Sequence, residues 1–506
     1  MSFLSAVRIA ELTGQPRPTD EQERIVEAPL LPALVVAGAG SGKTETMAAR
    51  VVWLLANGLV APDQVLGLTF TRKAAGELGE RVRRRVRLLV RCAAAAGVEL
   101  PGRDAMGVGG LLDGLARPTI STYNAYAASL VSDHALRIGL DPSARLLGEA
   151  AQWQLASEVV EAWDDDLGTE AALSTVVEAV LAMSGALDEH LLDPAAARTG
   201  IEGIADALLA TPPGTPPRGP YADVAKLLGS LGERARLLDV VARYRERKRA
   251  ADAIDFGDQV ALAARLARDV PEVGAAERER FRVVLLDEYQ DTSYAQLTLL
   301  SALFGGGHAV TAVGDPHQSI YGWRGASAGG LEDFPTTFPI VTDGGRRRAD
   351  VHQLSTSWRN DAAILDAANH VAAPLRSAAA RVPVPVLETR PGAGAGHVRA
   401  HVAETLEDEA RTVAEFVAER WRPGGRDAPR VTAAVLCRKR SQFEPLRRAL
   451  RARGLPVEVV GLGGLLSAPE VVDLLAALQA AHDPTRGDAL MRLLTGARMR
   501  LGAADL

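Results

Sequence analysis

Residues 37–44 place glycines, a lysine and a threonine in the order that phosphate binding requires. The stretch reads AGAGSGKT and directly follows an apolar run at residues 33–36. Glycines let backbone N–H groups turn toward an anion, and the N-terminus of a following helix adds the positive end of its dipole. Lys43 would reach the β- and γ-phosphates of a nucleotide, and the Thr44 hydroxyl would hold Mg²⁺. The predicted phosphate-binding loop consists of Ala37, Gly38, Ala39, Gly40, Ser41, Gly42, Lys43 and Thr44.

Ala37 departs from the general loop pattern GxxxxGK(S/T), in which a glycine comes first. A chance match in a glycine-rich chain is the alternative interpretation. The two glycines nearest the lysine remain, and a strand-like run and a helical pattern flank the loop. These flanks favour a phosphate site.

Two adjacent carboxylates, Asp287 and Glu288, follow the apolar run at residues 281–286. A buried strand that brings carboxylates to a phosphate-binding edge suits metal-dependent phosphoryl chemistry. Asp287 would hold Mg²⁺ through water, and Glu288 would orient and deprotonate the attacking water. If Lys43 and Asp287 line one site, the long interval between them must contain an inserted domain.

A further apolar run, at residues 309–313, leads into Gln318 and then Tyr321, Trp323 and Arg324. Gln318 is placed to sense phosphate, and the aromatic side chains offer a platform on which nucleic-acid bases stack. The alternative is that Tyr321 and Trp323 belong to the core. Aromatic residues make up only 4% of the chain, so their grouping here favours a binding role.

Phe70, Arg72 and Lys73 follow the apolar run at residues 65–69. Ligands bind at the carboxyl ends of parallel strands, so Phe70 would stack on a base while Arg72 or Lys73 meets a phosphate. Residues 72–91 carry eight basic and two acidic side chains, a balance typical of a helix that faces a nucleic-acid backbone. The alternative is that Phe70 is a core residue and the cations are solvated.

Gln22, Trp358 and Arg359 complete the candidate nucleotide contacts. Gln22 follows Thr19 at the spacing of a capping box. Its amide either only caps a helix or also reads the adenine edge, since an amide offers both a donor and an acceptor. Trp358 is placed to stack on adenine, and Arg359 is placed to reach the γ-phosphate.

Composition limits the class of protein. The chain has 506 residues, 47% apolar and 24% charged, so it is globular and long enough for roughly three or four domains. Its net charge of −6 argues against a protein that coats nucleic acid, although a local basic groove is compatible with it. Cys92 and Cys437 are too few for a disulfide framework or a metal cluster. No apolar run suits a membrane span and no export signal begins the chain, so a cytoplasmic protein without a membrane partner is expected.

The order of elements predicts an α/β protein, because strand-like runs alternate with helical patterns. Residues 123–254 are mostly helical and interrupt this alternation. A new αβ unit begins past about residue 345, with its clearest strand predicted at residues 431–436.

Taken together, the motifs resemble those of the superfamily 1 DNA helicases of the UvrD/Rep/PcrA type, in that family's order and spacing. The resemblance is carried by AGAGSGKT (37–44), LTFTRKAAGEL (68–78), ISTYNAYA (120–127), AIDFGDQV (253–260), LLDEYQDT (285–292), VGDPHQSIYGWRGA (313–326) and STSWRND (355–361). Within that family, the phosphate loop with its helix and residues 67–78 most resemble the B subunit of the AdnAB helicase–nuclease.

The resemblance implies two RecA-like P-loop NTPase domains, each a parallel sheet flanked by helices, with a mostly helical inserted domain. The implied divisions are a first RecA-like domain at 1–122 and 255–345, a helical insertion at 123–254, a second RecA-like domain at 346–485 and the start of a further insertion at 486–506. Trp358 stands where the family usually has tyrosine, which keeps a stacking face, and Tyr123 stands where histidine is common. The family's motifs V and VI do not occur in the sequence, so the chain resembles the N-terminal portion of a longer protein.

The implied ligands are ATP, Mg²⁺ and single-stranded or partly duplex DNA. In this family's pattern Gln22 and Trp358 hold adenine, and Gln318 and Arg359 sense the γ-phosphate. The expected DNA contacts are Phe70, Arg72, Lys73, Tyr321, Trp323 and Arg324. The implied activity is an ATP-driven 3′-to-5′ DNA helicase or translocase in DNA repair, with a partner subunit in a helicase–nuclease.

Two other functions remain open on the sequence. One is an ATP-gated DNA-binding subunit without unwinding activity, because motif VI is lacking. The other is a nucleoside kinase, which requires a phosphoryl acceptor and predicts no stimulation by DNA.

Overall fold

The computed structural model describes residues 3–101, 117–211, 221–322, 325–327, 329–377, 381–424, 429–460, 468–483, 486–496, 498–502 and 505. They form two compact units, residues 1–398 and 399–506. The α/β class expected from the sequence is confirmed, because a parallel sheet flanked by helices is the centre of the first unit.

The central sheet has six strands in the order β10-β1-β7-β6-β2-β3, and every pairing is parallel. The strands are β1 (Ala33–Ala37), β2 (Val65–Thr69), β3 (Thr119–Thr122), β6 (Val283–Leu286), β7 (Val310–Gly314) and β10 (Asp350–Leu354). The inner strands β1, β2, β6 and β7 are buried along their whole length, which is why they read as continuous apolar runs. The edge strand β10 lies past the expected boundary at residue 345, yet it pairs with β1.

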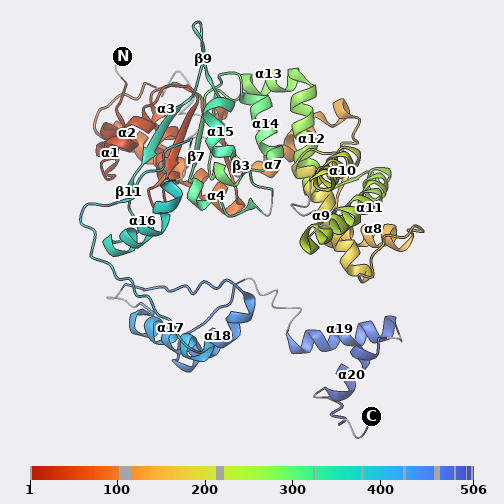
Figure 1. The fold of residues 1–506 in the computed structure, drawn as a ribbon. Helices are drawn as coiled ribbons and strands as arrows, with labels where there is room; N and C mark the ends of the chain where they lie inside the picture. The colour runs from red at the N-terminus through yellow and green to blue at the C-terminus, as the bar shows by residue number, and fades with distance from the viewer. Residues whose placement is uncertain are drawn as a thin grey trace. The chain divides into compact units, whose positions relative to one another are not determined.

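Helices cover the two faces of this sheet (Figure 1), and a hydrophobic core lies on each face. Along β1, Leu34 and Val36 enter one core while Val35 and Ala37 enter the other, as the alternation of side chains along a strand requires. One layer consists of α1 (Ala6–Thr13), α2 (Asp20–Val26), α3 (Lys43–Ala56) and α4 (Arg72–Ala95). The other consists of α7 (Tyr123–His134), α12 (Phe256–Asp269), α13 (Pro271–Arg280), α14 (Tyr294–Phe304) and α15 (Gly330–Thr337).

A helical insertion separates β3 and α7 from the rest of the sheet domain. Its helices are α8 (Glu149–Glu161), α9 (Leu173–Glu189), α10 (Pro194–Ala210) and α11 (Ala222–Ala250). They pack around a core of their own that includes Val177, Val241 and Tyr244. The short strands β4 (Arg145–Leu146) and β5 (Ala253–Ile254), which come before α8 and after α11, pair in parallel and bring the two ends of the insertion together. An inserted helical segment between the two halves of the sheet is what the long interval between Lys43 and Asp287 predicts.

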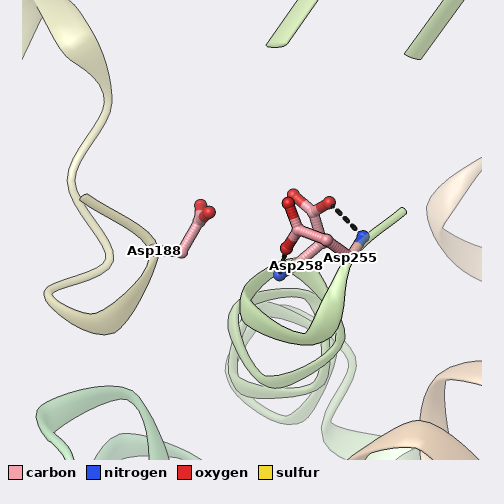
Figure 2. A group of neighbouring side chains, drawn as sticks. All are labelled: Asp188, Asp255 and Asp258. Atoms are coloured by element: carbon pink, nitrogen blue, oxygen red, sulfur yellow. Dashed lines mark hydrogen bonds between the residues drawn. The ribbon is translucent and has the colours of Figure 1, made fainter. Parts of the chain in front are cut away.

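Buried charges join the insertion to the sheet domain where α9, α11 and α12 meet. Figure 2 shows Asp188 of α9 facing Asp255 and Asp258 at the start of α12. Lys248 Nζ lies 2.5 Å from Asp255 Oδ2 and 2.6 Å from Asp258 Oδ2, and Arg245 pairs with Asp188. Asp255 also caps α12 by accepting from the Asp258 backbone N–H at 3.0 Å. Two cations already balance most of the carboxylate charge, so this group is an ion-pair network that joins α9 to α11 and α11 to α12.

Replacing Lys248 by methionine is expected to lower the free energy of unfolding by about 3–5 kcal/mol, because removing one partner leaves buried carboxylates unpaired. The Lys248 side chain is 2% exposed. Chemical denaturation followed by circular dichroism measures the change. Lys226→Met on the same helix is the matched control, since Lys226 is exposed, and it should shift the unfolding midpoint little. Equal midpoints for both variants would contradict a fastening role.

The other strands and helices are short strands and one longer helix in the first unit, and helices in the second unit. In the first unit they are the antiparallel β8 (Ile340–Thr342) and β9 (Gly345–Arg347), the parallel β11 (Thr356–Ser357) and β12 (Glu388–Thr389), and α16 (Ala362–Ser377). The second unit contains α17 (Leu406–Arg420), α18 (Phe443–Ala452), α19 (Pro469–His482) and α20 (Gly487–Thr495). The strand predicted at residues 431–436 is not formed. Among the described residues, only Val431 pairs, in a single bridge with Arg422, and residues 432–436 have no strand partner. Within the described part of the chain, no helix has the length and apolarity needed to span a membrane.

Candidate active site

The loop at residues 37–44 turns sharply between β1 and α3. Gly40 and Gly42 have φ values of 76° and 84°, in the left-handed region that favours glycine. A Cβ on Gly40 would also lie 2.7 Å from Arg359 Cβ and 2.8 Å from Ser357 Oγ, so a side chain has no room there. Ala37 is the last residue of β1 and fully buried. Because a strand residue needs no positive φ, alanine is tolerated in place of the usual first glycine.

The structure brings Lys43 and Glu288 together. Lys43 Nζ donates to Glu288 Oε2 at 2.8 Å, and the two residues follow β1 and β6, which flank β7 in the sheet. Glu288 has φ 49° and ψ 44°, a left-handed conformation that is rare for a residue with a side chain. Such strain persists where the surrounding structure imposes it, often at functional sites.

Carboxylates outnumber cations around Lys43. Asp287 is 4% exposed, and burial, followed by the charge of Glu288, raises its pKa to about 6, while Lys43 opposes the shift. The pKa of Asp291 is raised to about 6 by burial and then by Glu288, again against Lys43, and its Oδ1 is buried without a hydrogen-bond partner. Hard oxygen ligands with surplus negative charge fit Mg²⁺. Below about pH 6, a proton on Asp287 would compete with that cation.

Thr44 and Asp287 are the residues that would hold the metal. Thr44 is the second residue of α3, next to Lys43, and Asp287 extends β6 at the same edge of the sheet. A hydroxyl and a carboxylate at adjoining strand ends match the oxygen ligands that Mg²⁺ takes in nucleotide sites. No hydrogen bond between these two side chains defines their geometry, so the metal role of Thr44 and Asp287 stays a prediction.

Gln318 belongs to the short helix η4 (Pro316–Gln318) that follows β7. Its Nε2 donates to Asp315 Oδ2 at 2.6 Å. Asp315 and the buried Gln290 link Gln318 to Glu288, and neither was expected from the sequence. Gln290 belongs to η3 (Tyr289–Asp291) and donates to Glu288 Oε2 at 2.9 Å. A glutamine two residues after the carboxylate pair is the only sequence signal for it.

Trp358 lies against the phosphate loop. Its backbone N–H donates to Gly40 O at 2.8 Å, and Ser357 Oγ donates to Ala39 O at 3.1 Å. The side chain of Trp358 is 38% exposed and lines a cavity of about 570 Å³ beside the loop. Arg359 is exposed, and its Cβ atom lies next to Gly40. The structure thus brings the predicted adenine-stacking and arginine residues to the loop.

Gln22 forms the capping box, one of the two roles that the sequence left open, and its contact with adenine stays a prediction. Its Oε1 accepts from the Thr19 backbone N–H at 3.1 Å in a capping box. The amide nitrogen then faces the loop, 3.4 Å from the position of a Cβ on Gly42, and Gln22 lines the same cavity as Trp358. The cap therefore fixes the amide with its donor toward the place expected for adenine.

A second cleft, of about 970 Å³, runs between the sheet domain and the helical insertion. Phe70 and Arg72 line it, and the ring of Phe70 lies 5.1 Å from that of Tyr321 between centroids. Phe70 is therefore half-buried at the cleft and not in the core. Lys73 is solvated instead, with an 87% exposed side chain that pairs with Glu77. Trp323 and Arg324 lie outside the described residues.

The cationic helix α4 is partly neutralised by its own neighbours. Arg81 and Arg85 pair with Glu45 of α3, and Arg83 pairs with Glu80. The basic charge that remains for a nucleic-acid backbone is therefore smaller than the sequence count of residues 72–91 indicates.

Comparison with known proteins agrees with this geometry. Residues 18–339 match the UvrD/REP helicase N-terminal domain, and residues 352–506 match the UvrD-like helicase C-terminal domain. The chain is 30% identical over 485 residues to ATP-dependent DNA helicase UvrD1 of Mycobacterium tuberculosis, a match that covers 93% of this chain and 53% of the relative. It is 27% identical over 490 residues to ATP-dependent DNA helicase PcrA of Leuconostoc citreum, which covers 96% of this chain and 55% of the relative. The chain thus spans about half the length of these relatives. With the phosphate loop, the carboxylate pair and the cleft placed as described, the chain belongs to the UvrD/REP helicase family.

Proposed function

We propose that this chain hydrolyses ATP and uses the energy to move on single-stranded DNA. The observation that carries the proposal is that the candidate ATP site and the candidate DNA cleft lie at the same edge of the central sheet. Lys43 Nζ and Glu288 Oε2 lie 2.8 Å apart in segments that follow β1 and β6. Phe70 follows β2 and lines the cleft, and its ring contacts that of Tyr321 in the segment after β7. Relatives named ATP-dependent DNA helicases support it.

In this proposal the residues at the phosphate loop and at the ends of the neighbouring strands divide the work of binding and hydrolysing ATP. Lys43 and the loop N–H groups bind the phosphates, and Thr44 and Asp287 would hold Mg²⁺, which when bound would supply positive charge to the phosphates. Glu288 would accept the proton of the attacking water, since its contact with Lys43 holds the carboxylate next to the place proposed for the phosphates. Gln318 and Arg359 sense the γ-phosphate. Gln22 and Trp358 hold adenine.

The finer assignment rests on the motif resemblance. We propose 3′-to-5′ movement, a role in DNA repair or recombination, and a partner subunit in a helicase–nuclease of the AdnAB kind. Residues 346–485 would form the second RecA-like domain, and we propose a cytoplasmic location.

The test is ATP hydrolysis measured with and without a single-stranded oligonucleotide. Stimulation by DNA supports the proposed motor. Tight ATP binding without turnover would instead support an ATP-gated DNA-binding subunit, and phosphoryl transfer to a nucleoside without any effect of DNA would support a kinase.

Replacing Phe70 by alanine is expected to weaken single-strand binding by about 1–3 kcal/mol, the typical contribution of one base stacked on an aromatic ring. Fluorescence anisotropy of a labelled oligonucleotide measures the affinity. Tyr221→Ala is the control, because it removes a 65% exposed ring that does not line the cleft. Equal affinities for the two variants would exclude stacking on Phe70.

A further inference from the structure

Gln290 bridges the carboxyl ends of the neighbouring strands β6 and β7. The residue is 3% exposed. Its Nε2 donates to Glu288 Oε2 at 2.9 Å, and its Oε1 accepts from the Asp315 backbone N–H at 3.1 Å. Its backbone carbonyl accepts from Ser319 Oγ at 3.2 Å. One side chain therefore joins the carboxylate beside Lys43 to the segment that follows β7.

The orientation of this amide is determined by its partners. A backbone N–H can only donate, so the atom facing Asp315 N must be the amide oxygen, and the NH₂ group must face Glu288. The bridge also requires the glycine at 314, because a Cβ there would lie 2.7 Å from Gln290 Oε1. The geometry thus leaves one arrangement of the amide, with its donor on the carboxylate.

The segment beyond Asp315 leads to both the phosphate sensor and the DNA cleft. Asp315 Oδ2 accepts from Gln318 Nε2 at 2.6 Å. Three residues after Gln318, the ring of Tyr321 contacts Phe70 at the cleft. A displacement of this segment by a bound strand would therefore reach Glu288 through Gln290.

We infer that Gln290 is a positioning residue that couples occupancy of the DNA cleft to the placement of the Glu288 carboxylate. This inference rests on the proposed function, since it concerns the acceleration of ATP hydrolysis by DNA. Lys43 and the left-handed backbone at Glu288 hold that carboxylate without Gln290. Loss of the bridge should consequently harm the DNA-stimulated rate more than the basal rate.

Two variants test the bridge. Gln290→Met keeps the side-chain length and removes the hydrogen bonds to Glu288 and Asp315, together with a longer one of 3.4 Å to Asp291 Oδ2. Gln290→Glu keeps an acceptor for the Asp315 N–H and replaces the donor to Glu288 by a second carboxylate, which repels it. For both we expect the DNA-stimulated kcat to fall at least tenfold more than the basal kcat, with KM for ATP and affinity for a single-stranded oligonucleotide within about threefold of the unmodified protein.

Asn57→Leu is the matched control for loss of a buried amide. Asn57 is 5% exposed and its side chain hydrogen-bonds to Leu4 and Trp53, away from the site. It should leave the stimulation ratio unchanged even where it lowers the melting temperature. If both Gln290 variants keep the ratio, or lower the basal and stimulated kcat by the same factor, the coupling role is overturned. If the unmodified protein shows no stimulation, the proposed function fails and the inference fails with it.

Discussion

Replacing Glu288 by glutamine is expected to lower kcat for ATP hydrolysis by about 10²–10⁴-fold, the typical contribution of a general base, while ATP still binds. The amide keeps the shape of the side chain but cannot take a proton from water. The substitution also removes the negative charge of Glu288 from beside Asp287. Burial is the largest cause of the raised pKa of Asp287, and the charge of Glu288 is the second. The pKa of Asp287 should therefore fall below about 6 in the variant, so that a proton competes less with Mg²⁺ in mildly acidic solution.

Phosphate release measures the loss of turnover, and a fluorescent ATP analogue measures binding. Glu80→Gln is the control, since Glu80 lies on the exposed side of α4 and pairs only with Arg83 among the ion pairs of the described residues. A Glu288 variant that hydrolyses ATP within threefold of the unmodified rate would remove Glu288 from the chemistry.

Local patterns were sufficient to predict the four inner strands of the sheet and the loop. The strands β1, β2, β6 and β7 are buried on both faces, so each had to be a continuous apolar run that ends where polar groups begin. The carboxyl ends of parallel strands meet at one edge. For this reason Lys43 and Glu288, far apart in the sequence, could be expected at one site and lie 2.8 Å apart.

Features that depend on tertiary contacts could not be predicted in this way. The pairing of β10 with β1 follows from which edge is free and not from the local sequence. Gln290 looks like any polar residue after a strand, and only its hydrogen bonds to Glu288 and Asp315 reveal a bridge. Lys73 was predicted to contact DNA because it lies close to Phe70 in the sequence. On α4, however, its side chain turns to solvent, and only the structure shows this.

The two charge changes at the Lys43–Glu288 pair should separate binding from catalysis, since they have opposite signs. Lys43→Ala leaves the carboxylates of Asp287, Glu288 and Asp291 facing the loop without their nearest cation. It should therefore weaken ATP binding as well as hydrolysis, whereas Glu288→Gln relieves repulsion and should weaken hydrolysis alone.

Lys43→Ala is expected to lower kcat by about 10²–10³-fold, the typical effect of removing one preorganised donor to developing charge. ATP affinity should fall as well, because a hydrogen bond to a charged group contributes about 1.5–3 kcal/mol. The fold should stay intact, since Lys43 begins α3 outside both cores of the sheet domain. Circular dichroism, phosphate release and analogue binding measure the three quantities, with Lys226→Ala as the control for loss of an exposed lysine. Turnover that survives in Lys43→Ala, or ATP affinity that falls equally in Glu288→Gln, would contradict the assignment, because phosphate binding would then not depend on the charge of the loop lysine.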